Sequence, residues 1–140
     1  VLDASELNGY QIFLDNDCNS CHSGVNFTDN EFHNVGLYLN YADNGRQRVT
    51  TLASDNGKFK TPTLRNVERT TPFMHDGSLS SLEDVVEFLN SGGENHSNKS
   101  NLIQPMNLNT QEKADLVNFL KTLTDTEFLN NEKHGIFYEY

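Results

Sequence analysis

The sequence predicts an all-α fold in which a few helices and long loops surround a bulky apolar group. Three segments place apolar residues at helical spacing, and few segments alternate apolar and polar residues as strands do. Hydrophobic residues make up only 35% of the 140 residues, which is little for a self-sufficient core. The 9 Phe and 5 Tyr nevertheless argue against disorder, because disordered chains are poor in aromatic residues. We therefore expect one domain over residues 1–140, with an apolar cofactor in its middle.

The first predicted helix covers about residues 5–14. Its apolar residues share one face, at spacings of three and four: Leu7, Tyr10, Phe13 and Leu14. The second covers about residues 82–89, where Ser80 or Ser81 can cap the N-terminus and a Ser-Gly-Gly sequence at 91–93 ends the helix. The apolar stripe of this second helix consists of Val85, Val86 and Leu89.

The third predicted helix has the clearest pattern. Thr110 is its expected cap, and apolar residues follow at helical spacing: Leu116, Val117, Leu120 and Leu123. Between the helices, residues 23–79 and 91–109 have no clear period and are punctuated by Asn and Gly. Long loops of this kind make sense where a chain wraps around a cofactor.

The composition excludes several classes of protein. The chain has 10 Lys+Arg against 20 Asp+Glu, a formal net charge of −10. Nucleic-acid binding depends on cations that neutralise phosphates, so this balance argues against it. No stretch approaches the roughly 18 unbroken apolar residues of a membrane-spanning helix. With two cysteines placed close together, the chain is not a disulfide scaffold either.

The sequence Cys-Asn-Ser-Cys-His at 18–22 carries the strongest functional signal. Cys-x-x-Cys-His is the attachment signature of c-type haem. The thiols of Cys18 and Cys21 can form thioethers with the two vinyl groups of one porphyrin, and His22 then offers its imidazole as the proximal iron ligand. Because covalent haem c is loaded outside the cytoplasm, the motif implies export to the periplasm or a similar space.

Three other interpretations of the cysteine pair are weaker. A structural zinc site takes four ligands, usually from two such pairs, and this chain has one pair. A thioredoxin-like redox pair belongs to a βαβ context, and no strand pattern precedes Cys18. A disulfide between Cys18 and Cys21 would close a very small, strained loop.

The second axial ligand decides what a c-type haem does. An iron with Met as its sixth ligand transfers electrons, whereas a five-coordinate iron can bind small molecules or peroxide. The residues that could supply this ligand are Met74, Met106, His33, His75, His96 and His134.

Further blocks of sequence follow the haem motif in a known order. They lie at 32–37, 57–67, 71–78, 82–86, 92–93 and 112–117. Together with the Cys-x-x-Cys-His motif, these blocks resemble the C-terminal haem domain of the bacterial di-haem cytochrome c peroxidases and the related MauG proteins. The blocks cover nearly the whole chain, and the segment at 123–129 is similar to the usual end of such proteins.

The resemblance implies a cytochrome c-like fold wrapped around one covalent haem. In that family the C-terminal haem receives electrons from a small donor protein and passes them to a peroxidatic haem in the other domain. This chain has one haem motif and no Trp, whereas the family's bridging Trp belongs to the other half. We therefore expect either the separated C-terminal domain of a di-haem enzyme or a free-standing mono-haem relative, and neither would be a complete two-haem peroxidase alone. Its acidic surface favours a basic redox partner.

The resemblance also bears on the sixth ligand. It places the family's Met or Tyr ligand at Leu89, and leucine cannot ligate iron. Met74, on the loop before that helix, is then the preferred distal ligand, because the matching loop of the other domain lines the distal face. Met106 is the alternative, although the family usually has Leu there. If neither binds, a five-coordinate haem with weak peroxidase or small-ligand-binding activity is the alternative function, and a structural or sensory module is a third.

The same resemblance bears on Arg65 and His75, and the remaining histidines are judged from their surroundings in the sequence. Arg65 is expected to pair with a haem propionate, since Arg forms forked bonds with carboxylates. His75 corresponds to a residue near the edge between the two haems, where it would bond a propionate or shape the electron path. His33 is expected to be structural, and His96 and His134 are expected to be exposed.

A calcium ion lies between the two domains in the family. In this chain the backbone oxygens of Thr70 and Pro72 would contribute to it, and the other protein ligand would come from the second domain. Because calcium takes six to eight oxygen ligands, the site would be half-built and weak here. If a second domain normally covers one face of this domain, the apolar patch exposed in the isolated chain would favour dimerisation.

Overall fold

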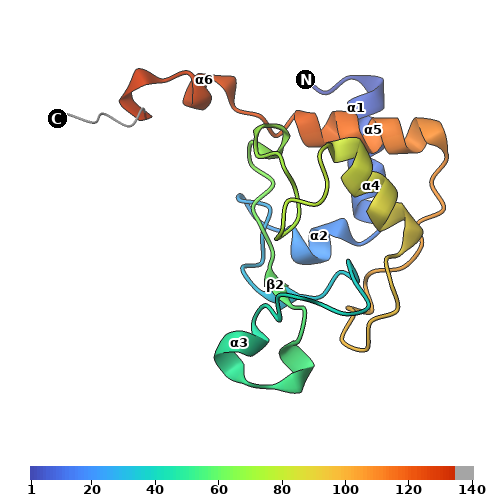
Figure 1. Cartoon of the computed structure of the whole chain (residues 1–140). Helices are drawn as coiled ribbons and strands as arrows, with labels where there is room; N and C mark the ends of the chain where they lie inside the picture. Colours follow the sequence, from blue (N-terminus) through green and yellow to red (C-terminus); the bar gives the residue numbers. More distant parts are fainter. Residues whose placement is uncertain (135–140) are drawn as a thin grey trace.

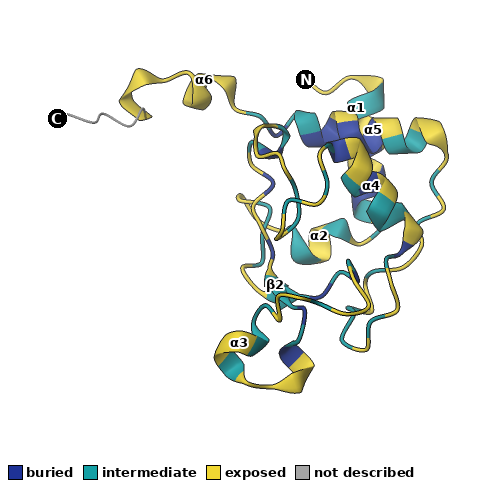
Figure 2. Ribbon diagram, in the orientation of Figure 1, coloured by how far each residue is buried: buried dark blue, intermediate teal, exposed yellow. Residues whose placement is uncertain are grey.

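The computed structural model describes residues 1–134 of the chain. Three longer helices gather at one end of the molecule: α1 (Ala4–Asp15), α4 (Leu82–Ser91) and α5 (Thr110–Lys121) (Figure 1). The short helix α2 (Cys18–Cys21) follows α1 and lies between this helical end and the loops of the opposite end. Figure 2 shows the buried residues concentrated at the helical end. No helix among residues 1–134 is long and apolar enough to cross a lipid bilayer.

Short elements interrupt the segments that lack a sequence period. β1 (Phe32–His33) and β2 (Phe59–Lys60) form an antiparallel pair with Phe32 opposite Lys60. The other short helices of the described residues are α3 (Gln47–Thr50), α6 (Thr126–Leu129), η1 (Ala53–Asp55), η2 (Val67–Arg69) and η3 (Glu132–His134). The all-α prediction is confirmed, because each of the two named strands in residues 1–134 has only two residues.

A glycine allows α1 and α5 to cross in close contact. A Cβ atom added at Gly9 would lie 2.0 Å from the carbonyl oxygen of Asp115 and 2.9 Å from Cβ of Phe119. Any larger residue at this position would therefore collide with the backbone of α5. The rings of Tyr10 and Phe13 both contact Phe119, each at a centroid separation of 5.3 Å. The core is thus built outward from this crossing.

The predicted buried face of α1 is correct only in part. Phe13 is buried and Leu14 packs partly buried against the core, as predicted. Leu7 is 57% exposed and Tyr10 is 39% exposed, whereas Gly9 and Ile12 are buried in their place. The prediction assumed that the larger apolar side chains point inward. The crossing overrides this pattern, because the closest approach of two helices must be made where a side chain is absent.

The apolar stripes predicted for the other two helices are largely confirmed. Val86, Leu116, Val117, Leu120 and Leu123 are buried, the last of them just beyond the end of α5. Val85 and Leu89 are half-buried on α4. The stripes hold because a helix that packs along its length buries one continuous face.

Local capping signals set the ends of α4 and α5. Ser81 caps α4 and Gly92 ends it in the left-handed conformation, as predicted. The predicted cap of α5 is wrong by one residue. Asn109 caps this helix and accepts hydrogen bonds from two backbone N–H groups of the first turn, so that Thr110 becomes the first helical residue. Both residue types are good caps, and only the extended backbone at Asn109 distinguishes them.

A buried carboxylate strengthens the contact between α1 and α5. Ser5 and Asn8 of α1 and Gln111 of α5 all donate hydrogen bonds to the side chain of Asp115. These hydrogen bonds, with that of Ser5 foremost, lower the pKa of Asp115. The folded state therefore favours the ionised carboxylate, the form that accepts from all three donors.

The crossing at Gly9 makes the first testable prediction. We expect Gly9→Ala to lower the free energy of unfolding by about 1–3 kcal/mol, because the added methyl group must push α1 away from α5. Urea denaturation followed by circular dichroism measures this change. Leu7→Ala is the matched control on the same helix, and we expect it to cost less than about 0.5 kcal/mol because this side chain is largely exposed. Equal losses in the two variants would contradict the assigned contact.

The lowered pKa of Asp115 predicts that acid weakens the helix pair. Its stabilising contribution is complete above the pKa of an unfolded aspartate, about 3.9, and is lost as the pH falls through the lower pKa of the folded state. Between about pH 6 and pH 3, the wild type should therefore lose more unfolding free energy than Asp115→Asn, which cannot titrate. Urea titrations at both pH values test this, and equal losses would assign the acid sensitivity to other carboxylates.

Candidate haem site

The two cysteines lie at opposite ends of a single helical turn. α2 begins at Cys18 and ends at Cys21, and His22 follows as its C-cap. Asp17, in the left-handed conformation, makes the sharp turn from α1 into α2. Cys18 packs against the hydrophobic core at the end of α1. The helix pair thereby fixes where the Cys-x-x-Cys-His motif begins.

The orientation of His22 suits a metal ligand. Its Nδ1 lies 2.9 Å from the carbonyl oxygen of Phe27, so the ring can donate a proton there and use Nε2 as the metal-binding nitrogen. Burial lowers the pKa of His22, although hydrogen bonds to the Phe27 and Pro62 carbonyls act in the opposite direction. The neutral imidazole that iron requires is therefore the favoured form.

The two thiols are not activated for redox exchange. Burial raises the pKa of the Cys18 thiol to about 11 and also raises the pKa of Cys21. Both cysteines are unpaired, with no disulfide between them. A thioredoxin-like pair requires a stabilised thiolate, so this geometry argues against that interpretation.

One further group of potential metal ligands adjoins the motif. A carboxylate oxygen of Asp29, a ring nitrogen of His33 and Sγ of Cys21 lie within 4.8 Å of one another. Within residues 1–134, this is the one group of at least three His, Cys, Asp or Glu ligands at such spacing. A structural zinc site takes four ligands, and Asp29 and His33 already bond each other at 2.7 Å. The zinc interpretation therefore stays weaker than haem attachment.

The haem motif is only partly covered by the rest of the chain. Five partly buried apolar residues pack against the core, and the list includes the first cysteine of the motif: Leu14, Cys18, Phe27, Phe73 and Leu108. Phe27 also supplies the carbonyl that bonds His22. Figure 2 shows α2 itself as partly buried and exposed, in contrast to the buried crossing above it. Two incompletely buried thiols on one helical turn, followed by an oriented imidazole, fit a covalently attached porphyrin.

The two methionines among the possible distal ligands, Met74 and Met106, are both half-buried. Met74 lies in the loop closed by a bridge between Phe73 and Leu79, and its backbone is left-handed with φ of 67°. Met106 is tied by its backbone N–H to the carbonyl of Asn90 at 3.1 Å. A left-handed methionine is a strained position that the surrounding structure must hold in place, which is common at functional sites. This difference favours Met74, and the assignment stays a prediction.

Arg65 holds the loop that orients His22. Its Nε donates to the carbonyl of Val25 at 2.8 Å, and its guanidinium lies 5.7 Å from the ring centroid of Phe27. Phe27 in turn supplies the carbonyl that bonds His22. Arg65 is exposed, and its expected bond to a propionate stays a prediction.

His75 stacks on an aromatic residue of β2. Its ring lies face to face with Phe59, with centroids 3.7 Å apart and planes inclined by 16°. Tyr41 and Tyr38 lie nearby, at centroid separations of 6.0 Å and 6.4 Å from His75. The side chain is exposed at the surface, and its predicted role beside the haem stays a prediction.

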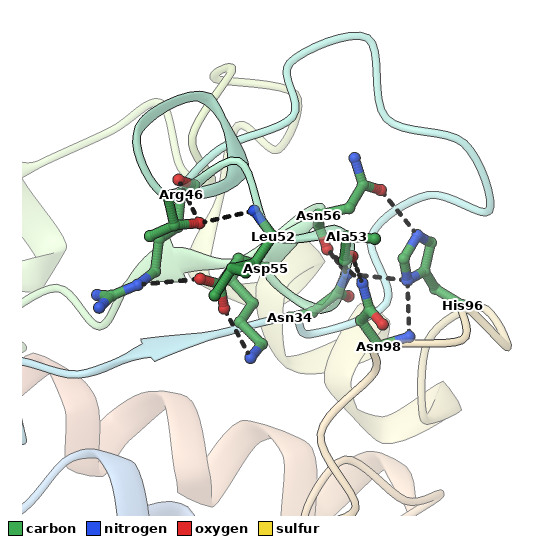
Figure 3. Close-up of polar contacts among 10 residues, drawn as sticks. Asn34, Arg46, Leu52, Ala53, Asp55, Asn56, His96 and Asn98 are labelled. Carbon is green, nitrogen blue, oxygen red and sulfur yellow. Dashed lines mark hydrogen bonds and ion pairs between the residues drawn. The ribbon is translucent and has the colours of Figure 1, made fainter.

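His96 joins three loops and is half-buried, so the prediction that it is exposed is wrong (Figure 3). Its Nδ1 lies 3.1 Å from Nδ2 of Asn34 and 3.0 Å from the backbone nitrogen of Asn98. Its Nε2 lies 3.2 Å from Oδ1 of Asn56. Asn34, which is only 1% exposed, also accepts hydrogen bonds at Oδ1 from the Gly36 backbone and the Tyr41 hydroxyl. Asn34 and Asn56 are far from His96 in the sequence, so no local pattern predicts these contacts.

Two other histidines and the two residues expected at a calcium site lie as follows. His33 pairs with Asp29, in agreement with a structural role, and His134 is exposed as predicted. Thr70 and Pro72, the expected contributors to a calcium site, are exposed. The calcium site itself stays a prediction.

Comparison with known proteins gives the family. A sequence profile described as cytochrome c matches residues 7–124, which is most of the chain. The chain belongs to the cytochrome c family. Membership implies covalently attached haem c, and with it the class of haem-based electron transfer. The predicted cytochrome c-like fold is thereby confirmed.

Individual relatives refine this assignment. The chain is 36% identical over 125 residues to the methylamine utilization protein MauG of Methylorubrum extorquens, covering 88% of this chain and 35% of that protein. It is 35% identical over 128 residues to the cytochrome c551 peroxidase of Nitrosomonas europaea, covering 89% of this chain and 35% of that protein. Among solved structures, a MauG-like protein associated with microbial copper homeostasis matches with a TM-score of 0.90 and 34% identity, over 95% of this chain and 50% of that chain.

These comparisons confirm the resemblance to the MauG and peroxidase proteins. This cytochrome c chain spans about a third of the two curated relatives and half of the solved MauG-like chain. That share corresponds to a haem domain. The activities named for these longer proteins are properties of those proteins.

The Asn34 network gives a prediction for the loops around the site. Asn34→Ala should lower the free energy of unfolding by about 1–3 kcal/mol, because it leaves buried hydrogen-bonding groups without partners. Thermal and urea unfolding measure the change. Asn40→Ala, at an exposed residue six positions further along the same loop, is the control and should change stability little. If Asn34→Ala unfolds with the same free energy as the wild type, the role assigned to the network is wrong.

Proposed function

We propose that this chain transfers electrons through a single covalently bound c-type haem. Cys18 and Cys21 would hold the porphyrin, His22 would be the proximal ligand and Met74 the distal ligand. The observation that carries the proposal is the imidazole of His22, which is fixed at Nδ1 by the Phe27 carbonyl beside two unpaired thiols on one helical turn. The bound haem supplies a one-electron iron couple.

The chain's own residues would prepare the site for rapid electron exchange. Phe27 fixes the tautomer and direction of the imidazole, and Arg65 holds that loop in place. Phe27, partly buried beside His22, would help to exclude water from the proximal side of the porphyrin. A ligand set held by the protein in both oxidation states keeps structural change between them small.

The charge of the chain supports a particular kind of partner. With a net charge of −10, the protein would attract a small redox protein that presents a basic surface. A second haem domain is the natural electron acceptor, since the chain spans about a third of its curated relatives. We place this exchange in the periplasm, where haem c is attached.

Visible spectra of the purified protein test the function and the distal ligand together. We expect a covalent haem, a low-spin ferric spectrum and the weak long-wavelength sulfur-to-iron band in the wild type. Met74→Ala should abolish that band and yield a high-spin spectrum, because no protein sulfur then reaches the iron. Met106→Ala is the matched control and should retain the band.

The other outcomes are equally decisive. If the band survives in Met74→Ala and disappears in Met106→Ala, Met106 is the ligand and the assignment of Met74 is wrong. A high-spin ferric spectrum of the wild type would contradict the electron-transfer proposal. It would support the alternative function, an open iron that binds peroxide or small ligands. Failure of the wild type to retain haem after acid-acetone extraction would overturn the proposal as a whole.

A further inference from the structure

A carboxylate lies beside the haem-attachment motif, and no sequence pattern singled it out. The chain returns to α2 at Asp29, whose backbone N–H donates to the Cys21 carbonyl at 2.7 Å. One oxygen of the Asp29 carboxylate, Sγ of Cys21 and a ring nitrogen of His33 lie within 4.8 Å of one another. The Asp29 carboxylate therefore lies beside Cys21. Cys21 would form one of the two thioethers and directly precedes His22 in the chain.

Hydrogen bonds hold this carboxylate in one place. Its Oδ2 lies 2.7 Å from Nε2 of His33, and its Oδ1 accepts from the backbone N–H of Glu31 at 2.9 Å. The side chain is 18% exposed, so solvent screens its charge only partly. Although desolvation opposes ionisation, the bonds from His33, Glu31 and Thr61 lower the pKa of Asp29. A fixed negative charge at neutral pH is the result.

The charge of Asp29 lies close to the point where the haem would be attached. Its carboxylate oxygen is within 4.8 Å of Sγ of Cys21, the atom that would bond the porphyrin. Because Asp29 is only partly exposed, water screens little of its charge over this short distance. The charge carried by Asp29 and its partner His33 therefore acts on a haem bound here.

We propose that Asp29, held by His33, is a positioning residue that lowers the reduction potential of the haem bound through His22. The proposal deepens the proposed function and rests on it. A nearby negative charge stabilises ferric iron, the more positive state, over ferrous iron, and the net charge around a haem is one of the factors that set its potential. Asp29 thereby makes this haem a better donor to the next centre.

Redox titration of the holoprotein at pH 7 tests the inference. We expect Asp29→Asn to raise the midpoint potential, equivalent to a change of about three- to tenfold in the equilibrium constant with a reference mediator. Glu127→Gln is the matched control: it removes the same charge from α6, which Figure 1 shows far from α2, and should leave the potential unchanged. The visible spectrum of each variant reports whether the iron ligands are retained.

A second variant separates charge from loop structure. His33→Lys keeps the Asp29 carboxylate but places a permanent cation beside it, and should also raise the potential. If both variants keep the wild-type spectrum and the wild-type potential, Asp29 only shapes the loop and the inference is wrong. If Asp29→Asn fails to fold, the potential of His33→Lys decides the question. A wild type without covalent haem overturns the proposed function, whereas normal haem with unshifted potentials overturns this inference alone.

Discussion

The backbone contact between α1 and α5 at Gly9 is the constraint on which the rest of the structure depends. Because no side chain separates the helices there, the direction of α1 is fixed by the backbone of α5. Cys18 begins α2 only three residues after α1 ends, so the helix crossing also fixes the haem-attachment motif. At the other end of α5, the Leu123 carbonyl accepts from the backbone N–H of Asn66, which ties the loop around Arg65 to the same helix.

The two ends of the molecule are held together by different forces. The helical end is an apolar core stabilised by burial, whereas the loop end is organised by hydrogen bonds among asparagines and His96 (Figures 2 and 3). In Figure 1, α2 with the Cys-x-x-Cys-His motif lies between the helical end and the loops around β2. Cys18 and Phe27 are partly buried and pack against the apolar core.

Local signals made part of this structure predictable. The Cys-x-x-Cys-His motif, the cap at Ser81 and the glycine stop at Gly92 each depend on neighbouring residues, so they can be identified in one chain. The buried face of α1 could be predicted only in part, because the burial of Gly9 is set by Asp115 and Phe119, more than 100 residues away. The same reason explains the misplacement of His96, whose partners belong to three separate loops.

The least predictable features of the site were those that depend on loop positions. Asp29 carries no signal in sequence, since an aspartate after a Gly- and Asn-containing stretch is typical of any turn. Its importance appears only once the loop returns to Cys21. The choice between Met74 and Met106 is of the same kind, because both methionines lie on loops and both are half-buried.

The pairing of the first and last long helices has a consequence for how the chain reaches its native state. Asn8 and Asp115 are 107 residues apart, so their contact closes a loop that includes most of the protein. The entropy of that closure must be overcome before the central core gains any stability from it, and folds dominated by such distant contacts form slowly. During synthesis from the N-terminus, α1 therefore stays without its partner until α5 has emerged. Until α1 and α5 pair, the two thiols that follow α1 are not held against a packed core, which keeps them accessible for haem attachment.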